Sequence, residues 1–182
     1  MADPRKPFPV KIEFNTLHSQ FLQTYSSFEL ALEIAIKNLL RLTNDEVAVV
    51  CGGLGAGAKV HLLKSLISIQ KDPTIKADSV TRAQNLASRN TWAHGIVLSS
   101  TSGQDNFFLL YREGKERFQV KGKPFTAEKM SEYATEFMKA YLEVLKDLGL
   151  TEADVQNYTQ SLLRLAPDHL FLDTPPPEEK TS

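Results

Sequence analysis

The chain has 182 residues, of which 42% are hydrophobic and 24% are charged. This length and composition are those of a single ordinary globular domain, which excludes a low-complexity or fibrous chain. The formal net charge of −1 argues against a protein that coats nucleic acid, because broad phosphate binding leaves a basic excess. It does not exclude an enzyme that meets RNA at one local patch.

The single cysteine and the amino terminus indicate the cell compartment. Cys51 has no partner for an internal disulfide, which fits a reducing cytoplasm, and we expect it to be a small buried residue. The first residues contain no apolar core of signal-peptide length, and no apolar stretch approaches the roughly 20 residues that span a bilayer. We therefore predict a cytoplasmic protein without a membrane partner.

The amino-terminal part of the chain predicts a flexible segment followed by a long helix. Three prolines within the first nine residues indicate that residues 1–14 are extended or flexible. A helix then starts near Thr16 or Ser19 and runs to Leu42, because apolar residues recur at three- and four-residue steps. Asn44 and Asp45 break the pattern. The short apolar run 47–51 fits a helix or a strand, and periodicity does not separate the two.

The glycine-rich segment 52–57 superficially suggests a phosphate-binding loop. The Walker pattern needs a lysine directly after its last glycine and then Ser or Thr, but here Ala58 intervenes and Val60 follows Lys59. The dinucleotide-binding fingerprint also fails, since the glycines alternate without its final two-residue gap. We predict that the segment binds no nucleotide and is a flexible turn, or lets two helices approach closely.

The remaining pattern completes a mainly α fold. Helices are predicted over 60–69, 78–94, 127–148 and 151–165, the third capped by Thr126 and the last opened by a capping box at Thr151. A β-hairpin is predicted near 107–121, and the proline-rich tail 167–182 is expected to be disordered. We therefore predict one domain, residues 15–166, folded as an up-and-down bundle of about five helices with one small hairpin.

One cluster of polar side chains stands out, at the end of the predicted helix 78–94. Asn90 and His94 are four residues apart and share one helix face, so the amide can orient the imidazole. Arg89 leaves from the neighbouring face, but its long side chain reaches the same region. Gly95 supplies the residue that commonly ends a helix. A guanidinium, an amide and an imidazole together suit binding and proton transfer at a phosphate.

This cluster resembles the motif of the HEPN superfamily, which is Arg, then four to six residues of which the first is polar, then His. Arg89, Asn90 and His94 match it with four intervening residues. The resemblance implies a helical domain, a homodimer in which two motifs share one cleft, and metal-independent cleavage of RNA without a cofactor. It also implies a toxin or defence role, with a cognate antitoxin or neighbouring protein as a partner.

Two alternatives accompany this hypothesis. Arg89, Asn90 and His94 can be structural, through an ion pair, a helix-end hydrogen bond and a C-terminal cap, in which case the protein is a non-catalytic helical homodimer that acts as a scaffold. A basic patch after the motif is a candidate RNA contact or simply a solvated hairpin. Its members are Arg112, Lys115, Arg117, Lys121 and Lys123. No metal site is predicted, because no histidine has a ligand partner at helical spacing.

Overall fold

The computed structural model describes residues 9–70, 76–89, 96–99, 107–113 and 119–165 of the chain. These ranges hold six helices and three strands, and the fold is mainly α, as the sequence predicts. The helices are α1 (Pro9–Leu40), α2 (Asn44–Cys51), α3 (Ala56–Gln70), α4 (Asp78–Arg89), α5 (Ala127–Asp147) and α6 (Glu152–Leu165).

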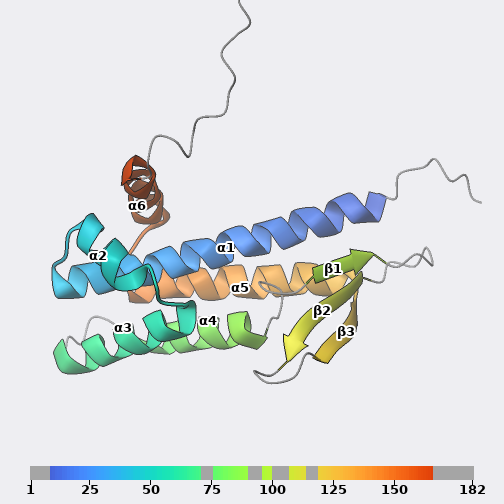
Figure 1. Ribbon diagram of the computed structural model, residues 1–182, viewed down its shortest axis with the longest axis horizontal. Coiled ribbons are helices and arrows are strands. Elements are labelled where there is room, and N and C mark those ends of the chain that lie inside the picture. The colour runs from blue at the N-terminus through green and yellow to red at the C-terminus, as the bar shows by residue number, and fades with distance from the viewer. Residues whose placement is uncertain (1–8, 71–75, 90–95, 100–106, 114–118, 166–182) are drawn as a thin grey trace, which may run out of the picture.

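The two longest helices form the centre of the molecule. Helices α1 and α5 lie side by side and run in the same direction, each starting at the end where the sheet lies, and α3 and α4 lie along one side of this pair (Figure 1). Helix α3 contacts α1, α4 contacts α5, and α3 and α4 contact each other. The short helix α2 and the last helix α6 contact α1 and one another at the end of the bundle away from the strands.

Aromatic side chains fill the core where α1 and α5 meet. The ring of Phe137 in α5 lies 5.2 Å from that of Phe21 and 5.9 Å from that of Phe28, both in α1. All three side chains are almost completely buried. Rings at these separations add specific attraction to the burial of apolar area, so this cluster fixes how α1 and α5 pack together.

Local signals define several helix ends. Thr43 forms a capping box with Glu46 at the start of α2, and the Thr126 hydroxyl accepts a hydrogen bond from the Lys129 amide at the start of α5. Gly149 has a φ of +65°, a conformation that favours glycine, and turns the chain between α5 and α6. The cap at Thr126 and the helix end at Gly149 agree with the predicted boundaries of the helix 127–148, whereas the box at Thr43 was not predicted.

Two helix starts differ from the sequence prediction. Helix α1 starts at Pro9, inside the segment predicted to be flexible, since proline is well tolerated in the first helical turn. Helix α3 starts at Ala56, within the glycine-rich segment. The run 47–51, for which helix and strand were both open, is helical within α2. Helix α4 is described from Asp78 to Arg89, and residues 90–95, which include its predicted end, lie outside the described ranges, as does the predicted tail.

The strands form one antiparallel sheet in the order β1 (Ile96–Ser99), β2 (Phe107–Glu113) and β3 (Gln119–Phe125). The sequence predicts a single hairpin near 107–121 and no strand before it, so β1 is an addition to the predicted fold. The sheet lies at the end of the bundle where α4 finishes and α5 begins (Figure 1).

No single helix in the described part of the chain is long and apolar enough to cross a membrane. Helices α2 and α3 reach the required hydropathy only when taken together, and the chain bends by 118° between them.

Candidate functional site

Helix α4 carries the first residue of the predicted Arg–Asn–His motif. Its buried face consists of Val80, Ala83 and Ala87, which anchor it on the bundle. Arg89 is the last residue of α4 that the structure describes. Asn90 and His94 lie outside the described residues, and the geometry among the three side chains is therefore not part of the structure.

The predicted basic patch is divided by the sheet. Lys121 and Lys123 occupy alternate positions of β3, where they pair with Tyr111 and Leu109, whereas Arg112 in β2 pairs with Val120. Because successive strand positions alternate between faces, Arg112 does not share a face with the two lysines. Lys115 and Arg117 fall outside the described residues. The register thus does not bring the described members together on one surface.

A shallow groove of about 530 Å³ runs between α3 and α4. Lys64 donates a hydrogen bond to the Thr81 hydroxyl at 3.2 Å, and Arg82 forms an ion pair with Glu143 of α5 at 2.9 Å. Arg82 precedes Arg89 by seven residues, which is two helical turns or about 10 Å, and the two positions share one face of α4. The groove therefore lies on the face of α4 on which the motif begins.

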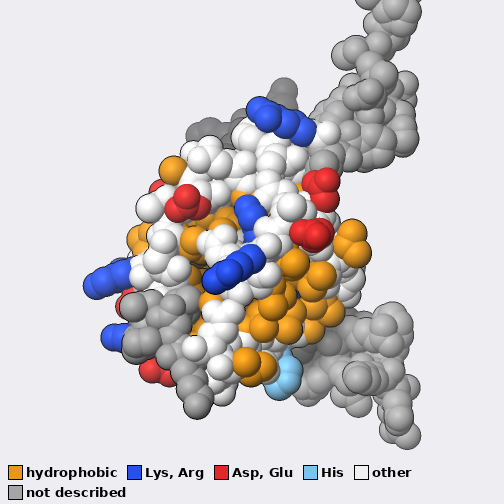
Figure 2. Space-filling view, turned by 90° about the vertical axis from the view of Figure 1, so that its left-hand side faces the viewer, with side chains coloured by type: hydrophobic (Ala, Val, Ile, Leu, Met, Phe, Trp, Pro, Cys, Tyr) orange, Lys and Arg blue, Asp and Glu red, His pale blue; other side chains and the backbone are white. Residues whose placement is uncertain are grey.

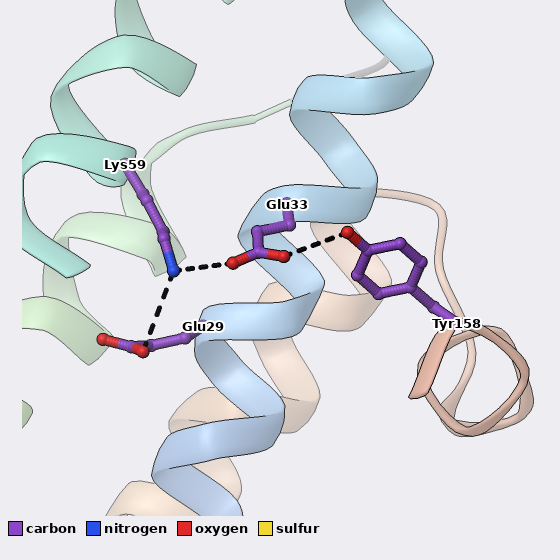
Figure 3. A network of polar contacts seen from close by, with 4 residues as sticks. All are labelled: Glu29, Glu33, Lys59 and Tyr158. Atoms are coloured by element: carbon purple, nitrogen blue, oxygen red, sulfur yellow. Dashed lines mark hydrogen bonds and ion pairs between the residues drawn. The ribbon is translucent and has the colours of Figure 1, made fainter. Parts of the chain in front are cut away.

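The best-buried polar cluster lies elsewhere, between α1, α3 and α6 (Figure 3). Lys59 is only 6% exposed, and its ammonium donates to the Oε1 atom of Glu33 at 2.7 Å. The other carboxylate oxygen of Glu33 accepts a hydrogen bond of 3.0 Å from the Tyr158 hydroxyl. Glu29, one turn earlier on α1, lies 3.8 Å from the same ammonium. Glu33 therefore links α3 to α6 through one carboxylate.

This cluster changes the titration of its neighbours. Burial, together with the nearby Glu33 carboxylate, raises the pKa of the Tyr158 phenol above its ordinary value. Burial also raises the pKa of Cys51, and the charge of Glu33 adds to that increase. A thiol kept protonated and enclosed is a poor nucleophile, so Cys51 is an inert core residue, as the sequence predicts.

Sequence reasoning missed this cluster, although the signal was present. Lys59 lies four residues before the buried Leu63, so it continues the apolar face of α3, and a lysine in that position needs a partner. The glycine segment before it was assigned to a turn or a close approach of helices. Gly57 supports the second reading, since a Cβ atom there would lie 3.3 Å from the Gln84 side chain of α4.

Another groove, of about 820 Å³, lies between α1, α5 and α6. Its walls carry mostly hydroxyl, amide and apolar side chains, with Lys139 and Glu152 as the charged residues among those that line it. Near its α6 end, Tyr141 has a pKa raised by burial and by Glu152. This composition suits contact with another uncharged protein surface better than contact with a phosphate chain.

A second apolar surface lies at the opposite end of the bundle from the sheet. Hydrophobic side chains gather on this end (Figure 2), where α2 and the carboxyl end of α1 lie. Exposed apolar residues of these helices are Leu40, Val49 and Val50. Within the described ranges, no three His, Cys, Asp or Glu side chains converge in a way that could hold a metal ion.

No family model, no curated protein and no solved structure matches this chain.

Proposed function

We propose that this protein is a HEPN-like, metal-independent endoribonuclease in which Arg89, Asn90 and His94 act in a site composed at a homodimer interface. The observation that carries the proposal is the sequence Arg-Asn-x-x-x-His-Gly at residues 89–95. The helix that leads into this motif, α4, packs against α3 and α5, and catalytic groups need support of this kind.

The mechanism follows from the residue types. A neutral His94 imidazole removes the proton of a ribose 2′-hydroxyl, whose oxygen then attacks the adjacent phosphorus. Arg89 neutralises the charge that builds on the phosphate oxygens, and its planar fork matches two of them at once. Asn90 orients the imidazole. The protonated His94 of a second copy gives its proton to the departing 5′-oxygen, and the product ends in a 2′,3′-cyclic phosphate.

The groove between α3 and α4 is compatible with this proposal. Arg82 shares a face of α4 with Arg89, two turns away, and Lys64 lines the same groove. Both cations already have partners, Glu143 and Thr81, so they are available to a phosphate only by exchange. Lys64 and Arg82 would add positive charge beside the proposed site, but the proposal does not depend on them.

The test is cleavage of a single-stranded RNA by purified protein in the presence of a chelator, with the matching DNA as a control. RNA should be cut, DNA should remain intact, and products should carry cyclic phosphate ends. His94→Ala should lower the rate by about 10²–10⁴-fold. Arg89→Lys should also lose most activity, because an ammonium cannot reproduce the planar fork.

Two matched variants control for general effects of substitution. His61→Ala removes an exposed histidine of α3, and Arg164→Lys makes the same exchange at an exposed position of α6. Both should retain full activity. If the wild-type protein and all folded variants leave RNA uncut, the ribonuclease proposal is wrong.

A second candidate function is favoured by the groove between α1, α5 and α6. Its mostly uncharged walls fit a non-catalytic helical homodimer that serves as a scaffold or binds a partner such as an antitoxin. A protein that associates stably but cleaves no RNA, and whose Arg89 and His94 variants behave like wild type, would support the scaffold.

A further inference from the structure

We infer that a pocket between α1, α2 and α6 binds a free α-amino acid, a small molecule that carries one positive and one negative charge. The pocket measures about 340 Å³, which is at the small end of the range for ligand pockets. It lies at the end of the bundle away from the sheet, where these three helices contact one another (Figure 1). None of the described residues that line it belongs to the proposed ribonuclease site, so the two proposals stand or fall separately.

Two opposite charges line the pocket from different helices. Lys37 comes from α1 and Asp154 from α6. Hydrogen bonds from Thr151 hold the pKa of the Asp154 carboxyl below its ordinary value, so this group is ionised at neutral pH. Within the described residues, no ion pair joins Lys37 to Asp154. Each charge is therefore available to a ligand that carries the opposite one.

A zwitterion satisfies both charges at once. Thr151 donates two hydrogen bonds to the Oδ2 atom of Asp154, which leaves the Oδ1 atom for the ammonium group of the ligand. The ligand carboxylate binds the Lys37 ammonium, and hydrogen bonds between ionised groups are the strong ones. An α-amino acid carries both groups on one carbon atom, so it fits a pocket of this size.

Three amide side chains complete the polar lining. Asn38 comes from α1, Asn44 from α2 and Asn157 from α6. Each amide can donate and accept hydrogen bonds, so the three together can bind the ammonium and the carboxylate of one ligand. The site therefore depends on the packing of α6 against α1 and α2, and no single helix supplies it.

Asn44 provides an acceptor that no described residue satisfies. Its Nδ2 atom donates to the Ser161 hydroxyl oxygen at 2.9 Å, and that hydroxyl donates its own hydrogen to the Tyr158 carbonyl at 2.7 Å. These two bonds determine which way the amide points. Its Oδ1 atom is enclosed and has no hydrogen-bond partner. A buried acceptor without a donor is unfavourable, and an N–H group of a bound ammonium supplies the donor.

The apolar part of the lining is small. It consists of Ile34, Leu150 and Tyr158, and the Tyr158 hydroxyl is already bonded to Glu33 (Figure 3). Ile34 and Tyr158 are only 6% and 4% exposed, so they offer little surface to a ligand. The side chain of the amino acid should therefore be short.

The lining fits other classes of ligand less well. A nucleic acid needs several cations, and Lys37 is the one cation among the described residues of the pocket. Asp154 is likewise the one carboxylate there, which is too few for a calcium or magnesium site. A neutral sugar would leave Lys37 and Asp154 without partners of opposite charge.

Calorimetric titration of the full chain with each of the natural L-amino acids tests the inference. One with a short side chain, such as L-alanine, should bind with a dissociation constant of about 1 mM or below. Analogues that lack one charged group, ethylamine and propionate in the case of L-alanine, should bind about tenfold more weakly or worse, because each loses one charged contact.

Two variants with matched controls assign the binding to this pocket. Lys37→Gln should weaken binding by about tenfold, whereas Lys129→Gln, the same exchange at an exposed position of α5, should have no effect. Asn157→Ala should weaken binding by about threefold or more, with Gln160→Ala at an exposed position of α6 as its control. Both target residues make no side-chain hydrogen bond within the described structure, so the variants should remain folded.

Three results would overturn the inference. The first is a wild-type protein that binds no amino acid saturably at concentrations up to about 10 mM, roughly ten times the expected dissociation constant. The second is equal affinity for the amino acid, for its singly charged analogues or for inorganic phosphate. The third is binding that Lys37→Gln and Asn157→Ala leave unchanged or weaken no more than their controls do.

Discussion

Helix α5 presents two faces that differ by a single residue step in the sequence. Met130, Phe137 and Val144 are seven residues apart and fully buried, whereas Ser131 and Met138, one step further on, face outward. The buried face is large and apolar because it packs against other helices of the bundle. The outward face carries charged residues, among them Glu132, Glu136 and Glu143, together with the exposed apolar residue Met138.

This difference in burial predicts which substitutions in α5 destabilise the fold. Solvent-facing positions on a helix normally carry charged residues, which keep the monomer soluble. The buried face of α5 holds this helix in the bundle, whereas the outward face contributes little to that packing. Substitutions on the two faces should therefore differ in their effect on stability.

The largest expected effect on stability is at Phe137. Its ring contacts Phe21, Tyr25 and Phe28, so Phe137→Ala should create a cavity and lower the free energy of unfolding by about 3–5 kcal/mol. The adjacent substitution Met138→Ala should change it by only about 0.5 kcal/mol under monomeric conditions. Urea denaturation at low protein concentration measures both, and equal losses would contradict the assignment of the two faces.

The buried cluster around Lys59 should give the next largest effect. Glu33→Gln removes the carboxylate that pairs with a nearly buried ammonium, and it should cost about 3 kcal/mol because the lysine charge loses its main partner. The comparison is Glu29→Gln, at a more exposed carboxylate 3.8 Å from the same ammonium, which should cost under about 1 kcal/mol. Thermal unfolding of the two variants distinguishes them. A larger loss for Glu29→Gln would show that the ion pair is shared differently.

The smallest effect concerns the start of α6. Hydrogen bonds from Thr151 lower the pKa of the Asp154 carboxyl below its ordinary value of about 4. A lowered folded-state pKa means that the stabilisation is present above the ordinary value and is lost as pH falls through the lowered one. The protection factors of the amides in the first turn of α6, which correct for the intrinsic pH dependence of exchange, should therefore fall on acidification below about pH 4.

The matched variant for this test is Asp154→Asn, which cannot titrate at that position. It should expose the first turn of α6 to faster exchange already at neutral pH, with less additional change on acidification. Glu46 makes the corresponding contacts to Thr43 at the start of α2, and its lowered pKa predicts the same direction there. An acid response at α6 that is unchanged in Asp154→Asn would assign it to another group.

Local chemistry determined most of the helices directly from the sequence. The apolar steps in α1 and α5, the cap at Thr126, the box at Thr151 and the turn at Gly149 are short-range signals, and the helices they predicted are present. The Arg–Asn–His motif is also a short-range signal. It predicted a site at the end of α4, and it stays a prediction, since only the backbone of its first residue is described.

Contacts between distant segments decided the rest. The run 47–51 fits a helix or a strand locally, and it is helical because the box at Thr43 opens α2 and the buried Val47 and Cys51 pack on the core. Lys59 follows a segment that looks like a turn, yet it is buried because Glu33, 26 residues earlier, supplies the opposite charge. The groove beside α5 exists because α1 and α6, which are remote from α5 or from each other in sequence, line its other walls. Periodicity shows which residues share a helix face, but burial depends on the neighbouring elements, and these come from remote parts of the chain.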